Sequence, residues 1–205
     1  MQIRELAVPD AYEITTQQFR DDRGVFLEWY RFEQLEQLTG RAFTLRQANT
    51  SVSRRGTVRG IHFADVPPGQ AKYVTCTRGA VLDYVIDIRT GSPAFGSWDS
   101  VRLDEQDRSA IFLSEGLGHC FIALEDDSTV SYLVSEVYNP QREHGITPLD
   151  PEIGLDFPIP ASELLLSAKD TEAPSLSQAA AQGLLPAWDA VKDFYLTLPK
   201  TAAAR

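Results

Sequence analysis

The sequence predicts a mainly β fold in which antiparallel strands form a sandwich or barrel. Between residues 44 and 138, short β-rich runs are separated by turn residues at intervals of roughly 8 to 12 positions. Hydrophobic residues make up 43% of the chain and charged residues 23%, as in soluble globular domains. The 205 residues favour one domain spanning 1–205. We expect its core at about 21–170 and a helical extension at about 171–200.

Ahead of the β-rich block, the pattern predicts one short helix. Phe32, Leu35 and Leu38 recur at helical spacing, and Gly40 can adopt the left-handed conformation that ends a helix.

Two strand pairs are expected inside the block, each joined by a short turn. The runs 71–77 and 80–88 flank Arg78-Gly79, and the runs 119–124 and 129–135 flank the turn at 125–128. Both pairs are therefore predicted to be antiparallel hairpins.

After the block, the proline-rich segment 147–160 predicts an irregular connection. A helix is expected over 176–181, and another after Pro186, where apolar residues again recur at helical spacing. These helices should pack over the barrel. The tail 201–205 is expected to be frayed.

Charge and cysteine usage limit the possible partners. With 19 Lys+Arg against 29 Asp+Glu, the net charge is −10, and such a field repels nucleic acid and anionic membranes. The N-terminus lacks a signal-peptide pattern, and no segment approaches the roughly 20 apolar residues that span a bilayer, so we expect a cytoplasmic protein. Cys76 and Cys120 lie far apart and are expected to be buried small hydrophobes, the alternative being a reactive thiol.

The densest group of reactive residue types surrounds His62, one of three histidines. A lone histidine in a strand is often a core group, but a Pro/Gly segment that separates it from Lys72 favours a functional site. Lys72 shares a strand face with Val74 and Cys76, which is costly unless that face borders a polar cavity. The other interpretation of Lys72 is a strand-end residue that reaches solvent.

Strand alternation puts His119 on one face with Phe121 and Tyr132 on one face with Val130. If both faces point inward, His119 and Tyr132 line one cavity; the alternative for Tyr132 is a core residue with its hydroxyl satisfied. Arg59 and His62 are three positions apart, so a regular strand would send them to opposite faces, although Gly60 permits a bend.

A histidine in a small β-barrel raises the possibility of a metal site. Such sites usually use His-x-His, but Ala64 stands two positions after His62. The third histidine, His144, lies in a charged segment and is expected to be solvated. We therefore predict no metal site.

A series of motifs, in order along the chain, resembles one known family. The motifs are Asp22–Glu28, Gln47–Ser53, Arg59–His62, Pro67–Val74, Asp87–Pro93, Gly96–Trp98, Gly118–Phe121, Tyr132, Tyr138, Asp150-Pro151 and Ser167–Asp170. Together they resemble the dTDP-4-dehydrorhamnose 3,5-epimerase family from about Asp21 to Pro186. The resemblance implies a cupin-type antiparallel jelly-roll barrel with a few short peripheral helices and no metal or other cofactor.

The implied activity is that of an isomerase acting on dTDP-4-dehydro-6-deoxyglucose. Its ketone acidifies the hydrogens on both neighbouring carbons, so proton removal followed by reprotonation on the opposite face inverts them. The product would be dTDP-4-dehydro-L-rhamnose or a related deoxysugar. The alternative is a single-centre 3- or 5-epimerase of an antibiotic deoxysugar pathway. A metal-dependent cupin oxygenase and a catalytically silent sugar-binding module are the other classes considered.

The resemblance also implies roles for individual residues. His62 matches the base, Asp170 the carboxylate that orients it, Lys72 the group that stabilises the enolate, and Tyr132 the acid. An imidazole suits base duty near neutral pH, whereas a phenol stays protonated there and can donate.

The remaining matched positions bind substrate in the family. Arg23, Arg59 and Lys169 match positions around the diphosphate, and Tyr138 matches the aromatic residue that stacks on thymine. The other substrate-binding matches are Phe26, Glu28, Gln47, Asn49, Lys72, His119 and Glu143.

The family also exchanges N-terminal strands between two subunits. Arg23 and Glu28 would then act across a homodimer; the alternative for both is a surface ion pair. This sequence departs from the family pattern at Cys120, because the residue after His119 is usually small in the family. The departure affects the expected position of the His119 side chain.

Overall fold

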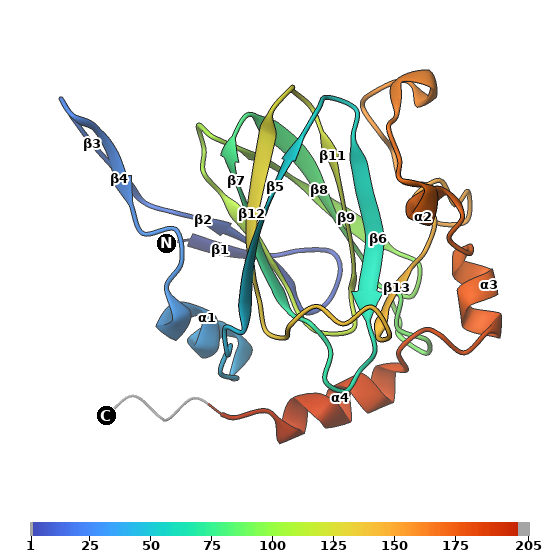
Figure 1. Ribbon diagram of the computed structural model, residues 1–205. Coiled ribbons are helices and arrows are strands. Elements are labelled where there is room, and N and C mark those ends of the chain that lie inside the picture. The colour runs from blue at the N-terminus through green and yellow to red at the C-terminus, as the bar shows by residue number, and fades with distance from the viewer. Residues whose placement is uncertain (1, 201–205) are drawn as a thin grey trace.

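Two antiparallel sheets face each other in the computed structural model, which describes residues 2–200 (Figure 1). One has six strands in the order β1 (Gln2–Glu5), β2 (Ala11–Thr15), β10 (Ala110–Leu113), β7 (Lys72–Arg78), β12 (Ser128–Val134) and β5 (Gln47–Ser53). The other has five in the order β13 (Glu143–Gly145), β6 (Val58–Ala64), β11 (Gly118–Ala123), β8 (Ala80–Ile86) and β9 (Trp98–Asp104). The predicted mainly β, antiparallel fold is confirmed.

Within residues 2–200, five short helical segments lie around the sheets. They are α1 (Phe32–Thr39), the 3-10 turn η1 (Ala161–Glu163), α2 (Ala168–Thr171), α3 (Leu176–Ala181) and α4 (Trp188–Thr197). The predictions of α1, α3 and α4 are confirmed, and Gly40 ends α1 with a left-handed φ of 68°. No helix in the described range is long and apolar enough to cross a membrane. The predicted frayed tail at 201–205 lies outside the described residues.

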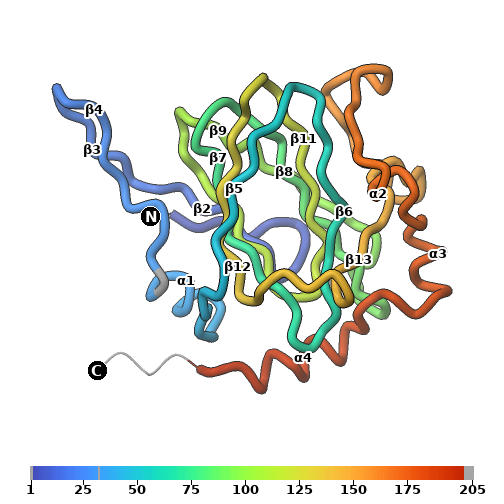
Figure 2. Tube along the Cα trace, in the orientation of Figure 1, coloured from blue at the N-terminus to red at the C-terminus, as the bar shows by residue number. Residues whose placement is uncertain are grey.

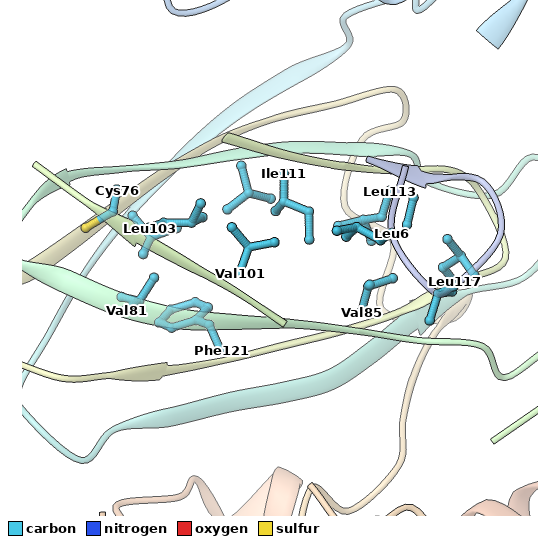
Figure 3. Close-up of a cluster of buried hydrophobic side chains, with 14 residues drawn as sticks. Leu6, Cys76, Val81, Val85, Val101, Leu103, Ile111, Leu113, Leu117 and Phe121 are labelled. Carbon is cyan, nitrogen blue, oxygen red and sulfur yellow. The ribbon is translucent and has the colours of Figure 1, made fainter. Parts of the chain in front are cut away.

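The space between the sheets is filled by inward-facing apolar side chains (Figure 3). Val74 and Cys76 of β7 point into this core, as do Val81 and Val85 of β8. Residues two apart on a strand share a face, so the alternation of the sequence fixes which side chains enter the core.

The outer faces of both sheets are covered as well. Leu35 of α1 packs with Tyr73 and Phe112 on the six-stranded sheet, and Leu176 of α3 packs with Cys120 on the five-stranded sheet. The central strands are therefore buried on two faces, which explains the nearly continuous apolar runs in β8 and β11. Cys120 is buried, as predicted, and it packs on the outer face of its sheet and not in the inter-sheet core.

The two predicted hairpins are wrong, although their strands exist. β7 pairs with β10 and β12 whereas β8 pairs with β9 and β11, so the chain crosses between sheets at Gly79. The turn between β11 and β12 crosses back in the same way. The two crossings meet at Ser128, whose hydroxyl donates to the Ala80 carbonyl at 2.9 Å. A tight turn is compatible with a hairpin but does not determine which strands pair, and here the partners of β7 and β8 all come from later in the chain.

A two-stranded ribbon, β3 (Gln18–Asp21) and β4 (Gly24–Leu27), projects from the body of the molecule (Figures 1 and 2). The strands that precede it, β1 and β2, belong to the six-stranded sheet. Leu6, Val8 and Ala11 enter the inter-sheet core, so that core includes residues before position 21, where we expected it to begin.

Candidate active site

A pocket of about 430 Å³ opens between the two sheets. Strands of both sheets and the segment before and within α2 supply its walls. The lining residues are Ser51, Arg54, Thr57, Val58, Arg59, His62, Lys72, His119, Phe121, Tyr132, Leu165, Leu166, Ser167, Lys169 and Asp170. All four residues predicted to be catalytic, His62, Lys72, Tyr132 and Asp170, are brought together here.

One wall carries a histidine–carboxylate pair. His62 Nε2 of β6 lies 2.7 Å from Asp170 Oδ1 of α2. The Asp170 side chain is buried, whereas about a third of His62 is exposed in the pocket. Burial alone would raise the pKa of Asp170, but hydrogen bonds from His62 and Ser167 and the charge of Lys169 hold it below its usual value. The carboxylate therefore stays ionised and can stabilise an imidazolium.

A second such pair lies beside the first. His119 Nε2 is 3.0 Å from both carboxylate oxygens of Asp83, and His119 faces His62 across the β6–β11 pairing. Burial raises the pKa of Asp83. The hydrogen bond and charge of His119 and the charge of Lys72 act in the opposite direction and lower it, but the pKa stays above its usual value. Asp83 was not among the site residues predicted from the sequence. A carboxylate inside the apolar run 80–88 was the available signal, because such a group needs a buried partner.

The strand β6 is not regular where it lines the pocket. His119 pairs with His62 and Phe121 pairs with Arg59, so two steps along β11 match three along β6. This β-bulge puts Arg59 and His62 on the same side, where both line the pocket. Gly60, at the bulge, has a φ of 124°, which side chains other than glycine rarely adopt. The bend that Gly60 was expected to permit is therefore present in β6.

The opposite wall carries Lys72 and Tyr132 on the paired strands β7 and β12. Lys72 is only 8% exposed, so the interpretation as a solvated strand end is wrong. Burial lowers its pKa, opposed by the charges of Glu143 and Asp83. Burial and Glu143 raise the pKa of Tyr132, so the phenol keeps its proton at neutral pH.

A smaller hollow of about 180 Å³ shares His62, Lys72 and Tyr132 with the main pocket. Its other walls are polar and come from Gln47, Asn49, Gln70, Tyr138 and Glu143. The Gln47 side chain donates to Asn49 Oδ1 at 2.7 Å and accepts from the Tyr138 backbone N–H at 3.0 Å. Tyr138 is 56% exposed at the edge of this hollow, where its ring can contact a planar group.

Cations gather around the main pocket. Arg59 and Lys169 line it as expected for an anion site, and Arg59 Nε donates to Ser53 Oγ at 3.2 Å. Arg54 lines it too and was missed by the sequence analysis, although it follows directly on the motif Gln47–Ser53. Within the described residues, the Ser51 hydroxyl is a buried polar group without a hydrogen-bond partner.

Three predicted binding residues lie outside the pocket of their own chain. Arg23 and Phe26 are on the projecting ribbon and Glu28 follows it, and none lines either hollow. Arg23 forms an exposed ion pair with Asp21 at 2.6 Å, and Phe26 is 67% exposed. Within one chain these residues have only surface contacts.

The expectation that His144 is solvated is wrong. Its Nε2 lies 2.7 Å from Asp65 Oδ1, and its ring lies against Phe63. Pairing of β13 with β6 brings the two chain segments together.

Across residues 2–200, no group of three or more His, Cys, Asp or Glu side chains is arranged to hold a metal ion.

Comparison with known proteins identifies close relatives of this chain. The family model described as dTDP-4-dehydrorhamnose 3,5-epimerase matches residues 5–178. The Mycolicibacterium smegmatis dTDP-4-dehydrorhamnose 3,5-epimerase is 54% identical over 198 residues, 97% of each chain.

Two solved structures are also similar. The Mycobacterium tuberculosis rmlC epimerase has a TM-score of 0.94 at 50% identity, covering 97% of this chain and 100% of that one. ChmJ, a 3'-monoepimerase from Streptomyces bikiniensis in complex with dTDP-quinovose, has a TM-score of 0.91 at 44% identity, covering 94% and 97%.

Proposed function

Because the chain belongs to the dTDP-4-dehydrorhamnose 3,5-epimerase family, it is an isomerase of dTDP-4-keto-6-deoxysugars, and we propose that the pocket between the sheets is its active site. The observation that supports this is the division of chemical groups between two walls. A histidine with a buried carboxylate lies on one wall, and a lysine and a tyrosine lie on the other. Proton removal from one face of a sugar and delivery to the other needs this division.

In the proposed reaction His62 is the base. Its neutral imidazole takes the proton from a carbon beside the ketone, and the electron pair moves to the ketone oxygen to give an enolate. Asp170, 2.7 Å from the ring, stabilises the imidazolium that forms. The Lys72 ammonium stabilises the enolate oxygen, an interaction strengthened by its burial. Tyr132 then gives its phenolic proton to the opposite face of the carbon while the electron pair returns from the enolate oxygen, and proton exchange with water restores the neutral imidazole and the phenol before the next inversion.

We propose that both carbons beside the ketone are inverted, giving dTDP-4-dehydro-L-rhamnose. In a gluco-configured ring the hydrogens on carbons 3 and 5 are both axial on the same face. One wall carrying His62 can therefore serve both carbons, provided that the ring shifts between the two steps. The runner-up is inversion of one carbon only, as in ChmJ, a 3'-monoepimerase of the same fold.

The nucleotide would occupy the polar and cationic surroundings of these groups. Arg59 and Lys169 suit the diphosphate, because guanidinium and ammonium groups form charge-assisted hydrogen bonds with phosphate oxygens. Tyr138 offers an exposed ring for the thymine base. Gln47 and Asn49, next to Tyr138, supply polar contacts to the nucleoside, with Glu143 and His119 completing the substrate-binding set.

We further propose a homodimer in which each chain's ribbon reaches the partner's pocket. The support is that Arg23 and Phe26 are highly exposed on a ribbon that projects from its own chain (Figure 1). Exchange would bring Arg23 to the diphosphate and bury Phe26, with Glu28 following them.

We also propose a cytoplasmic location, because both cysteines are buried and unpaired.

The activity is tested by proton NMR of the 4-keto sugar nucleotide incubated with the protein in deuterium oxide. Deuterium should enter carbons 3 and 5, and the product should be inverted at both. Labelling and inversion at one carbon would establish the runner-up. The His62→Ala variant should retain nucleotide affinity but lose about 10² to 10⁴ in rate. Activity within a few-fold of wild type would remove His62 from the role of base.

The dimer is tested by mixing Arg23→Ala with His62→Ala, each of which should be strongly impaired alone. If the ribbon is exchanged, a mixed dimer has one pocket with both residues intact. About one quarter of the pockets in an equal mixture should then be active after the subunits have exchanged. No recovery with proven mixed dimers would contradict the exchange.

A further inference from the structure

The serine before α2 makes two hydrogen bonds to a single residue, the partner of His62. Ser167 Oγ accepts from the Asp170 backbone N–H at 3.1 Å, which makes Ser167 the N-cap of α2. The same hydroxyl donates to Asp170 Oδ2 at 2.8 Å. A hydroxyl has one hydrogen and two lone pairs, so both bonds can form together.

These bonds leave the Asp170 carboxylate with one partner on each oxygen. Oδ2 receives the hydrogen of Ser167, while Oδ1 lies 2.7 Å from His62 Nε2. Rotation of the carboxylate would break both contacts. Asp170 is only 5% exposed, so water has little access to replace a lost donor. The orientation of the carboxylate toward His62 therefore depends on the Ser167 hydroxyl.

We propose that Ser167 is a positioning residue for the epimerisation: its hydroxyl fixes the Asp170 carboxylate, which in turn orients the His62 imidazole. This inference rests on the proposed function, in which His62 is the base. Ser167 borders the pocket, but its role is exerted through Asp170.

The turn that carries Asp170 has support that does not involve the Ser167 side chain. The Ser167 carbonyl accepts from the backbone N–H groups of Asp170 at 3.1 Å and of Thr171 at 3.0 Å. The Thr171 hydroxyl donates to the same carbonyl at 3.0 Å. A Ser167→Ala variant should therefore keep the turn and lose only the side-chain bonds to Asp170.

The chain offers a matched control in Ser175, the N-cap of α3. Its hydroxyl accepts from the Gln178 backbone N–H at 3.2 Å, and the Gln178 side chain accepts from the Ser175 backbone N–H at 2.9 Å. Ser175 thus caps a helix as Ser167 does, but its partner does not line the pocket. Each variant loses one N-cap, but Ser167→Ala also leaves Asp170 Oδ2 without its donor, so it should lower Tm more than Ser175→Ala, and only Ser167→Ala should change catalysis.

The test compares three single variants by steady-state kinetics. Ser167→Ala should lower kcat between about 10-fold and 100-fold, with KM changed by less than about two-fold, because the base is misoriented while binding is kept. Ser167→Thr retains the hydroxyl and should restore most of kcat. Ser175→Ala should keep wild-type kcat. If Ser167→Ala does not fold, Ser167→Gly replaces it, because glycine is also accepted at N-caps.

A double variant shows whether Ser167 acts through Asp170. In an Asp170→Ala background, adding Ser167→Ala should cause no further loss of kcat. The same loss in both backgrounds, or wild-type kcat for Ser167→Ala, would overturn the inference. If that happens while His62→Ala is inactive, the proposed function stands; if His62→Ala is active, the proposed base itself is wrong.

Discussion

Replacing Gly60 with alanine should damage both stability and catalysis, because this glycine forms the bulge that turns Arg59 and His62 to the same side. A Cβ at position 60 would lie 2.4 Å from the His119 carbonyl oxygen and 2.7 Å from Cys120 Cα. Real Cβ contacts essentially never fall below 3.0 Å, so β6 and β11 must separate by at least the difference of 0.6 Å between 3.0 and 2.4 Å.

Two costs follow from this geometry. The φ of 124° is strained for any residue with a side chain, at about 1–3 kcal/mol. Forcing the packed strands apart adds about 1–3 kcal/mol. Together they give about 2–6 kcal/mol, which for a chain of this size lowers Tm by at least about 4 °C. The displaced backbone carries His119 and adjoins His62, so kcat should fall about 10-fold or more.

The measurement is Tm by calorimetry together with kcat and KM for Gly60→Ala. Gly91→Ala is the matched control, since Gly91 also has a positive φ, 85°, but nothing lies within 4 Å of its added Cβ. Gly91→Ala should lose some Tm and keep kcat. Wild-type kcat for Gly60→Ala, or an equal loss in both variants, would refute the role of the bulge.

Four further outcomes are expected. Tyr132→Phe should still exchange solvent deuterium at the carbons beside the ketone, because His62 can remove and return protons on its own face, but inversion should be slowed far more than exchange. Inversion as fast as exchange would mean that another group is the acid. Lys72→Ala should lower kcat about 10² to 10³-fold, since one oxyanion donor is lost; a change in KM alone would make it a binding residue. Glu143→Gln removes a charge that raises the pKa of both Lys72 and Tyr132, so both lose their protons at lower pH and the basic limb of kcat/KM should move to lower pH. An unmoved limb would show that neither group controls it. Prolonged chelation should leave kcat unchanged, because Ala64 stands where a second histidine ligand would be needed; activity restored by one particular metal would contradict this.

Local patterns predicted the elements of the fold well, because helices and strands depend on spacing along the chain. Gly40 ends α1, and Lys72–Arg78 and Ala80–Ile86 are strands, as the sequence indicated. The choice of strand partners was not predictable in the same way. It depends on β9, β10, β11 and β12, which follow later in the chain and pair with β7 and β8 in two different sheets.

The same limit applies to the site. The expectation that an inward His119 and an inward Tyr132 would line one cavity is confirmed, because β11 pairs with β8 and β12 with β5 in unbroken register and both side chains line the pocket. Alternation could not show Arg59 beside His62, because a bulge adds a residue and reverses the faces beyond it. Asp83 was missed because its partner lies 36 positions away on another strand.

Backbone pairing between two distant segments brings His62 and Asp170 together. The two residues are 108 positions apart, and residue types alone gave no reason to pair them. Their two segments pair a few residues ahead of the site, at the start of β6. There the Leu165 N–H donates to the Gly56 carbonyl and the Leu165 carbonyl accepts from the Val58 N–H, at 2.9 Å each. Five residues after Leu165 the chain reaches Asp170, and four residues after Val58 it reaches His62. The short distance between His62 and Asp170 is therefore set by the backbone pairing at Leu165 and by the two short segments that follow it. A substitution that disturbs this pairing should change the His62–Asp170 distance, although it makes no contact with His62.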